Sequence, residues 1–250
     1  MSVIHAEPDP SSACLEPLPP QAWPQGRDVH VWSIDLSAPA AAPAECLDER
    51  EVDRARRFVH SDDARRYVRA HVALRSILGA YLGCEPARTA FAEEAQGKPR
   101  LVGPRGGLHF NLSHSKELAL LALGSADELG VDVEAVRPDL PGADLAAAVL
   151  DARELEQLAL VPDEAQAEPF VTCWTRKEAC LKAVGLGLNL EPRSLYAGLQ
   201  AQPMRVRIGP RELELMSLEV RPGYRAALAV AGGIGQVLRF DLGGDGVRAR

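Results

Sequence analysis

Several features that identify common protein classes are missing from the sequence. It has no uncharged apolar run close to the roughly 18 residues that a membrane-spanning helix needs. Its N-terminus lacks the basic start and apolar run of a signal peptide. It also lacks a Walker loop and a Gly-x-Gly-x-x-Gly motif at the start of a βαβ unit, which removes the commonest nucleotide-binding folds. We therefore expect a cytoplasmic protein that does not enter a membrane.

Cysteine is present but forms no recognisable pattern. The sequence has five cysteines, an odd number, and no Cys-x-x-Cys pair. This usage argues against a disulfide scaffold and against a structural zinc site. We expect free thiols in a reducing compartment. The five are Cys14, Cys46, Cys84, Cys173 and Cys180.

Positive charge is in the minority over the whole chain. The formal net charge is −7 and the pI is about 5.5, which predicts a poor nucleic-acid binder. One segment departs from this balance: from Arg50 to Arg75 eight arginines stand against four acidic residues, a net charge of +4. Arginine binds phosphate with two parallel hydrogen bonds, although such a charge run can also be a solvated helix face. The turn at 97–99 presents a further cation, Lys98.

Capping signals and hydrophobic periodicity predict a mixture of helices and clustered strands. One helix is expected to begin at Asp48, with Glu51 completing a capping box. A second is expected from an N-cap at Ser61 to a stop at Gly83. Further helices are expected over 144–160, with a break at Asp151, which could cap a new turn with Glu154 at N3, and over 167–184. Strands are expected over 28–36, 89–92, 108–112, 118–123, 130–136, 204–208, 212–220 and 224–230.

This order of elements favours the α+β class, because the strands are clustered rather than alternating strictly with helices. It also repeats coarsely, so we expect two similar halves, each a small antiparallel-rich sheet packed on a long helix. A chain of 250 residues is long enough for two such cores. The expected divisions are a Pro-rich lead-in (1–27), an N-terminal half (28–123), a C-terminal half (124–242) and a flexible tail (243–250).

The strand expected over 130–136 carries two carboxylates in the sequence GVDVE. Side chains alternate along a strand, so Asp132 and Glu134 share one face while Val131 and Val133 face the core. Two carboxylates on one face repel each other unless a cation lies between them. Mg²⁺ is bound in proteins by one or two carboxylates together with phosphate oxygens and water. The alternative is a solvated strand face.

The helix expected over 167–184 contains the sequence WTRKEACLK. Trp174, Glu178 and Lys182 are spaced by four residues and therefore lie on one stripe, with Lys177 beside it. Glu178 could be a third metal ligand, and Lys182 could meet a phosphate as a point charge. A surface pair of Glu178 and Lys182 beside a packed tryptophan is the alternative.

The sequence NLSHS, at the end of the strand expected over 108–112, offers polar groups where ligands are often held. The hydroxyls of Ser113 and Ser115, the imidazole of His114 and free backbone N–H groups suit a phosphate. A serine hydrolase is a weaker interpretation, because no Gly-x-Ser-x-Gly elbow surrounds Ser113. A simple polar turn is the remaining alternative.

Together these stretches resemble the 4′-phosphopantetheinyl transferases, and in particular the larger, monomeric Sfp type that serves peptide and polyketide synthetases. The resemblance covers about residues 50–190. It rests on RRFVHSDDARR (56–66), GKP (97–99), FNLSHS (110–115), GVDVE (130–134) and WTRKEACLK (174–182).

The resemblance implies transfer of the 4′-phosphopantetheine group from coenzyme A to a serine of an apo peptidyl or acyl carrier protein. It also implies a Mg²⁺ cofactor, coenzyme A in a cleft between two α+β halves, and a monomer. The implied metal ligands are Asp132, Glu134 and Glu178; the implied catalytic residues are Glu178, Lys177 and Lys182; and the implied contacts with coenzyme A are Arg54, Arg57, Arg66, Lys98, Pro99, Asn111, Ser113, His114 and Lys182. The chain departs from the family pattern at Glu51, where a relative can have lysine.

Two other functions use the same residues. A Mg²⁺-dependent hydrolase of nucleotide diphosphates would use the carboxylates with water as the acceptor. A coenzyme A-binding protein with a dead site would bind without turnover, although the intact set of carboxylates and Lys182 speaks against it.

Overall fold

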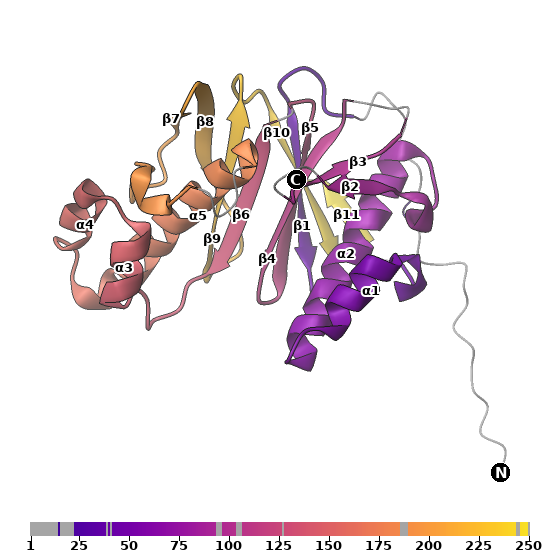
Figure 1. Ribbon diagram of the computed structural model, residues 1–250, viewed down its shortest axis with the longest axis horizontal. Coiled ribbons are helices and arrows are strands. Elements are labelled where there is room, and N and C mark those ends of the chain that lie inside the picture. The colour runs from indigo at the N-terminus through magenta and orange to yellow at the C-terminus, as the bar shows by residue number, and fades with distance from the viewer. Residues whose placement is uncertain are drawn as a thin grey trace, which may run out of the picture. The chain divides into compact units, whose positions relative to one another are not determined.

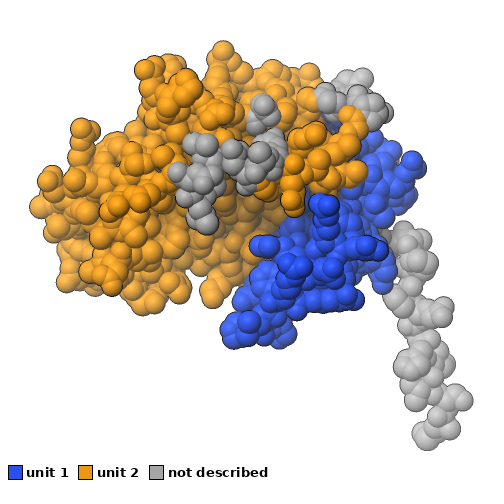
Figure 2. Space-filling model, viewed as in Figure 1, with its two compact units in different colours: residues 1–23, 39–89 blue, residues 24–38, 90–250 orange. Residues whose placement is uncertain are grey.

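The structure is a computed structural model that describes residues 15, 23–38, 40, 42–93, 97–103, 107–126, 128–185, 190–243 and 246–249. The chain divides into two compact units, shown in different colours in Figure 2. Unit 1 comprises Met1–Trp23 and Pro39–Thr89, and unit 2 comprises Pro24–Ala38 and Ala90–Arg250. Most of the Pro-rich lead-in predicted for 1–27 lies outside the described residues.

Unit 1 is helical. It contains α1 (Glu49–Arg56) and α2 (Ser61–Leu82), with the short 3-10 helices η2 (Ala44–Cys46) and η3 (Pro86–Arg88). The capping box at Asp48 and Glu51 is confirmed, because each side chain accepts a hydrogen bond of 2.9 Å from the backbone N–H of the other. Gly83 ends α2 in the left-handed conformation, with φ 66°. The predicted N-cap was wrong by one residue: His60 precedes α2, and Ser61 is its first helical residue.

A buried arginine joins α1 to α2. Arg75 is only 1% exposed, and a buried guanidinium must be paired to be tolerated. Its Nε donates to Glu51 at 2.7 Å, and its Nη2 donates to Asp48 at 2.8 Å. His71 lies 2.9 Å from the other oxygen of Glu51. Glu51, the departure from the family pattern, is therefore part of the packing of unit 1.

Unit 2 is built on two sheets. A five-stranded sheet has the order β11-β10-β1-β5-β4, a four-stranded sheet has the order β6-β9-β8-β7, and β2 pairs with β3 (Figure 1). All described pairs are antiparallel except β1 with β10. The strands are β1 Val29–Asp35, β2 Phe91–Glu93, β3 Pro99–Leu101, β4 His109–Ser115, β5 Leu118–Gly124, β6 Leu129–Ala135, β7 Met204–Ile208, β8 Arg211–Leu218, β9 Tyr224–Ala231, β10 Val237–Gly243 and β11 Gly246–Ala249. The predicted α+β class is confirmed.

The end of the chain differs from the expectation. Strand β10 falls in the predicted C-terminal half, yet it pairs in parallel with β1 of the predicted N-terminal half. Residues 243–250 were expected as a flexible tail, but Gly246–Ala249 instead form β11 against β10. Glycine-rich composition predicted the tail, and composition contains no information about a distant strand that can pair with it.

The helices of unit 2 follow the predicted boundaries. The helix expected over 144–160 is α3 (Ala143–Val149) and α4 (Ala152–Leu158), separated at Asp151, which caps α4 in a capping box with Glu154. Helix α5 (Ala167–Val184) ends at Gly185 in the left-handed conformation. Two 3-10 helices, η4 (Asp163–Ala165) and η6 (Pro192–Ser194), flank α5. Among the described residues, none of the helices combines the length and the hydropathy that a membrane span requires.

Helix α5 lies across one face of the four-stranded sheet (Figure 1), packing Ala179 and Ala183 against the apolar side chains of β8 and β9. The other face of this sheet shares a core with the five-stranded sheet, where Val131 of β6 packs with Val31 and Leu120. One face of β6 is therefore buried in this core, and its other face is turned toward α5.

Candidate active site

Strand β6 presents its polar side chains toward α5. Val131 and Val133 are fully buried in the core between the sheets, as the alternation predicted. Gly130 lies on the other face, against α5, where a Cβ atom would collide with Ala179 O and Ala183 N. Glycine is thus required there because the two backbones approach closely. The same face carries Asp132 and Glu134 to a cavity beside α5.

That cavity, of about 410 Å³, is the first of two at α5 and is called the carboxylate cavity here. It brings together residues from three elements: β4, β6 and α5. Its lining consists of Leu112, Ser113, His114, Asp132, Glu134, Trp174, Glu178 and Lys182. Residues predicted from three separate stretches of sequence therefore meet around one space.

Asp132 is at the centre of the polar contacts in this cavity. Its side chain is 3% exposed. Oδ1 accepts hydrogen bonds from Lys182 Nζ at 2.6 Å and from Ser113 Oγ at 2.7 Å. Lys182 Nζ also donates to Ser113 Oγ at 2.9 Å, which closes a triangle. Oδ2 is buried and has no hydrogen-bond partner, a condition that is costly unless a ligand satisfies it.

The other two carboxylates are affected by burial and by Asp132. Burial raises the pKa of Glu134 above its usual range, and the Asp132 carboxylate raises it further. Burial also raises the pKa of Glu178, again with a contribution from Asp132, while Lys182 opposes the rise. Three acidic groups thus repel one another in a partly desolvated space. A cation in the cavity would relieve this repulsion.

The chemistry of these donors fits a hard divalent cation. Carboxylate oxygens are the ligands that Mg²⁺ prefers, and Asp132 Oδ2 is a buried oxygen without a partner. Within the described ranges, no three His, Cys, Asp or Glu side chains are already arranged to hold a metal ion. The cation that lies beside Asp132 is the ammonium of Lys182. Asp132, Glu134 and Glu178 are therefore suitable in type and location, but they are not a closed metal site.

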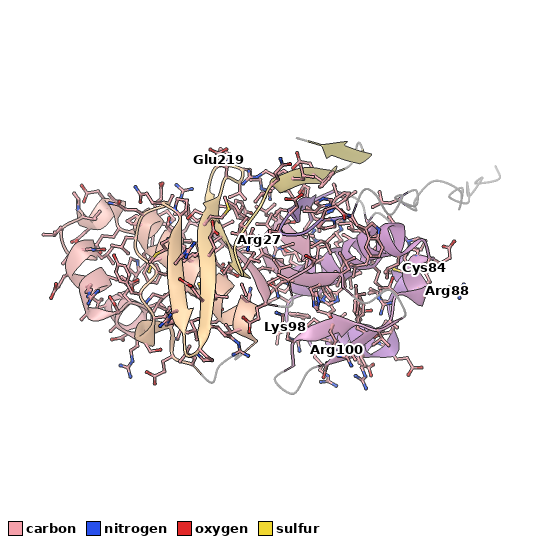
Figure 3. All side chains as sticks on the ribbon, turned by 90° about the horizontal axis from the view of Figure 1, so that it is seen from above. Arg27, Cys84, Arg88, Lys98, Arg100 and Glu219 are labelled. Carbon is pink, nitrogen blue, oxygen red and sulfur yellow. The ribbon has the colours of Figure 1, made fainter. Side chains whose placement is uncertain are left out.

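A second cavity, also of about 410 Å³, shares Glu178 and Lys182 with the first. We call it the apolar cavity, because leucine and proline side chains form much of its wall. Its lining consists of Gly97, Lys98, Pro99, Asn111, Glu178, Leu181, Lys182, Gly185, Leu190, Glu191 and Pro192. Lys98, labelled in Figure 3, donates from Nζ to the backbone carbonyls of Leu129 at 3.1 Å and Ala183 at 3.0 Å. Glu178 and Lys182 thus border two adjoining spaces.

Lys177 is not placed as the resemblance implied. It is fully buried and lines neither of these two cavities. Its Nζ lies 2.5 Å from Oε2 of Glu154, which is also fully buried, and donates to the carbonyls of Val149 and Pro192. The expectation that Lys177 lies beside the reacting centre is therefore corrected. Adjacent positions on a helix point about 100° apart, so Glu178 faces the cavities while Lys177 faces the interior.

The arginines predicted to contact coenzyme A belong to unit 1. Arg54 and Arg57 are exposed at the C-terminal end of α1, and Arg66 on α2 forms an ion pair with Asp63 at 3.0 Å. Their role toward phosphates stays a prediction.

Two residues of this region make contacts that the sequence did not predict, and Ser115, expected only as a phosphate partner, is the first. Ser115 Oγ donates to Oε2 of Glu134 at 2.7 Å. Glu154 was predicted only as a helix cap, yet besides Lys177 it accepts hydrogen bonds from Ala197 N and Gly198 N. The alternation N-x-S-x-S on β4 was the available signal for Ser115. No local signal distinguished Glu154 from the exposed acidic residues near it.

Comparisons with known proteins are consistent with this arrangement. A family model described as the 4′-phosphopantetheinyl transferase superfamily matches residues 128–220, and one for the N-terminal part of 4′-phosphopantetheinyl transferases matches residues 35–126. The chain is 38% identical over 222 residues to the 4′-phosphopantetheinyl transferase HetI of Nostoc sp. strain PCC 7120, covering 86% of this chain and 93% of that protein. It is 28% identical over 183 residues to the 4′-phosphopantetheinyl transferase Sfp of Bacillus subtilis strain 168, covering 72% and 80% of the two chains.

Proposed function

Because the chain belongs to the 4′-phosphopantetheinyl transferase superfamily, as a member of the Sfp type, we propose that it transfers the 4′-phosphopantetheine group of coenzyme A to a serine of an apo carrier protein, with Mg²⁺. The observation that supports this most directly is the carboxylate cavity. Asp132, Glu134, Glu178 and Lys182 line it together, which is the set of charges that a pyrophosphate and a divalent cation require.

The reaction joins an alcohol to phosphorus. The oxygen of the carrier serine forms a bond to the phosphorus on the pantetheine side of the pyrophosphate. The bond from that phosphorus to the bridging oxygen breaks, and adenosine 3′,5′-bisphosphate leaves. Such transfers depend mainly on positioning and on neutralising charge on the phosphate oxygens.

Two residues of α5 have roles in this step. Glu178 borders both cavities, so it is the candidate to accept the proton of the serine hydroxyl. Lys182 is 30% exposed, and its flexible side chain can leave Asp132 to contact the pyrophosphate. Lys177 has no part in the step, because its ammonium is enclosed with Glu154.

Asp132, Glu134 and Glu178 would hold the Mg²⁺. When bound, the cation neutralises charge on the pyrophosphate and on the leaving group. Lys98, Pro99, Asn111, Ser113, His114 and Lys182 line the two cavities and are proposed to surround coenzyme A; Arg54, Arg57 and Arg66 are proposed to add phosphate contacts.

The cavity residues come from a single chain, which supports action as a monomer. The described cysteines, Cys46, Cys84, Cys173 and Cys180, form no disulfide with one another, as a cytoplasmic location would favour. The proposed partners are peptidyl or acyl carrier proteins.

Intact-mass spectrometry of apo carrier proteins incubated with this protein, coenzyme A and Mg²⁺ tests the proposal. We expect the carrier to gain the mass of one phosphopantetheine, and this gain to be lost with EDTA and in Asp132→Ala. Asp139→Asn is the matched control, since that carboxylate is 73% exposed and pairs only loosely with Arg137. If no peptidyl or acyl carrier gains mass while coenzyme A still binds, the transferase proposal is wrong. Release of the bisphosphate without a carrier would indicate a hydrolase.

A further inference from the structure

Strands β4 and β6 are joined by side chains. Each lies at the end of its own sheet, and each forms backbone pairs with one described strand, β4 with β5 and β6 with β9. Asn111, Ser113 and Ser115 occupy alternate positions on β4 and therefore share one face. Asn111 Oδ1 accepts a hydrogen bond of 2.8 Å from Val131 N. The two serines continue this row toward the carboxylates.

Each serine donates a hydrogen bond to one carboxylate of β6. Ser113 Oγ donates to Oδ1 of Asp132, and Ser115 Oγ donates to Oε2 of Glu134, both at 2.7 Å. A serine hydroxyl has one proton to donate. Each hydroxyl also accepts from a nitrogen: Ser113 from Lys182 Nζ at 2.9 Å, and Ser115 from Ala135 N at 3.1 Å. These contacts direct the single proton of each serine to its carboxylate.

These hydrogen bonds occupy only one of the two oxygens of each carboxylate. One oxygen of Asp132 and one of Glu134 is held by β4. The second oxygen of Asp132, Oδ2, is buried and has no partner. A carboxylate that is fixed before a cation arrives loses less side-chain freedom when it binds one.

We propose that Ser113 and Ser115 are positioning residues that hold the two β6 carboxylates ready for the divalent cation, each through its hydrogen bond to one carboxylate oxygen. This inference rests on the proposed function, because it concerns the metal of that reaction. Hydrogen-bond partners of metal ligands typically change metal affinity by about 10–100-fold when removed. The same size of effect is expected here.

The test measures binding of Mn²⁺, as a spectroscopic substitute for Mg²⁺, by electron paramagnetic resonance of the free ion. We expect Ser115→Ala to weaken Mn²⁺ binding by about 10–100-fold, and Ser115→Thr, which keeps the hydroxyl, to restore most of it. Ser113→Ala should weaken binding similarly. Binding of coenzyme A in EDTA, measured by calorimetry, should be unchanged in Ser115→Ala, because Ser115 lines neither cavity.

Ser37→Ala is the matched control. Ser37 Oγ also donates to an aspartate, Asp35, at 2.7 Å, but on an exposed turn outside the two cavities. This variant should bind Mn²⁺ as the unmodified protein does. Thermal melting establishes that each variant is folded, and if Ser113→Ala does not fold, the pair Ser115→Ala and Ser115→Thr decides the question.

Three results would overturn the inference. Unchanged Mn²⁺ affinity in Ser115→Ala would do so while leaving the transferase intact. Loss of coenzyme A affinity in EDTA in Ser115→Ala, rather than of Mn²⁺ affinity, would assign Ser115 to the nucleotide. If the unmodified protein transfers phosphopantetheine without binding any divalent cation, both this inference and the metal part of the proposed function are wrong.

Discussion

Lys182 Nζ lies 2.6 Å from Oδ1 of Asp132, so a lysine of α5 already neutralises the buried carboxylate of β6. The aspartate is almost fully buried, whereas the lysine is 30% exposed. A charge that is buried needs a partner, and the exposed partner is the one that can move. In the proposed reaction the ammonium and the metal ion therefore compete for the same carboxylate until coenzyme A offers its phosphates to the lysine.

Lys182→Met should separate metal binding from catalysis. Removing the ammonium removes the competitor, so Mn²⁺ should bind the free protein at least as tightly as before. Transfer should fall by about 100-fold or more, because a positive group aimed at the developing charge is lost. Electron paramagnetic resonance measures Mn²⁺ affinity, and the mass-spectrometric assay measures the transfer rate. Lys116→Met, at an exposed turn, is the control. Weaker Mn²⁺ binding in Lys182→Met would contradict this competition.

Mg²⁺ should raise the melting temperature of the protein. A ligand that binds only the folded state stabilises it, and here it would also relieve repulsion among Asp132, Glu134 and Glu178. Differential scanning calorimetry with and without Mg²⁺ measures the shift. Mg²⁺ should raise the melting temperature of Glu134→Gln much less. The melting temperature of Glu156→Gln, a change at an exposed position on α4, should rise with Mg²⁺ as that of the unmodified protein does. Equal shifts in both variants would mean that the cation binds elsewhere.

Removing one partner of the Glu154–Lys177 ion pair should destabilise the protein more than replacing both partners with apolar residues. Both side chains are fully buried, and removing one partner of such a pair typically costs about 3–5 kcal/mol, because it leaves an uncompensated charge. Lys177→Met should therefore destabilise the protein strongly, and Glu154→Met/Lys177→Met should recover much of the loss. Urea denaturation gives the free energies of unfolding. Recovery of transfer in the double variant would show that Lys177 takes no part in the chemistry; a folded double variant without transfer would return it to the mechanism.

The same pair should make the protein sensitive to acid. Burial alone would raise the pKa of Glu154, but hydrogen bonds from Lys177, Ala197 N and Asp151 N outweigh it and hold the pKa below its usual range. The stability from this carboxylate is therefore present above the unfolded pKa of about 4.3 and is lost as the pH falls through the lower folded value. Urea denaturation at several pH values between 7 and 3 gives the free energies of unfolding of the unmodified protein and of Glu154→Gln. The difference between the two should become smaller as the pH falls. A difference that is constant over this range would refute the assignment.

Gly130→Ala should disturb the site without touching a charged residue. A Cβ atom at this position would collide with backbone atoms of Ala179 and Ala183, which cannot move as a flexible side chain can. We expect a loss of about 1–3 kcal/mol or more and a large loss of transfer, because β6 carries Asp132. Gly243→Ala is the control, since a Cβ atom there meets nothing within 4 Å. Thermal melts and transfer rates similar to the control would show that β6 can shift freely against α5.

Much of the local structure followed from the sequence. Helix α5 has the predicted bounds, 167–184, and both capping boxes, at Asp48 and Asp151, are present. These are short-range signals, because a cap depends on residues three positions apart and a helix depends on its own periodicity. The face shared by Asp132 and Glu134 followed in the same way from strand alternation.

The tertiary structure decided which residues meet. The parallel pairing of β10 with β1 joins residues more than 200 positions apart, and no local period contains that information. The contacts of Ser113 and Ser115 with Asp132 and Glu134 depend on how two sheet edges are placed side by side. Local pattern by itself determined the charged residues and their elements. The packing of α5 decided that Lys182 faces the cavity and Lys177 the interior. Helix periodicity places the two lysines on different faces, but it does not say which face is buried.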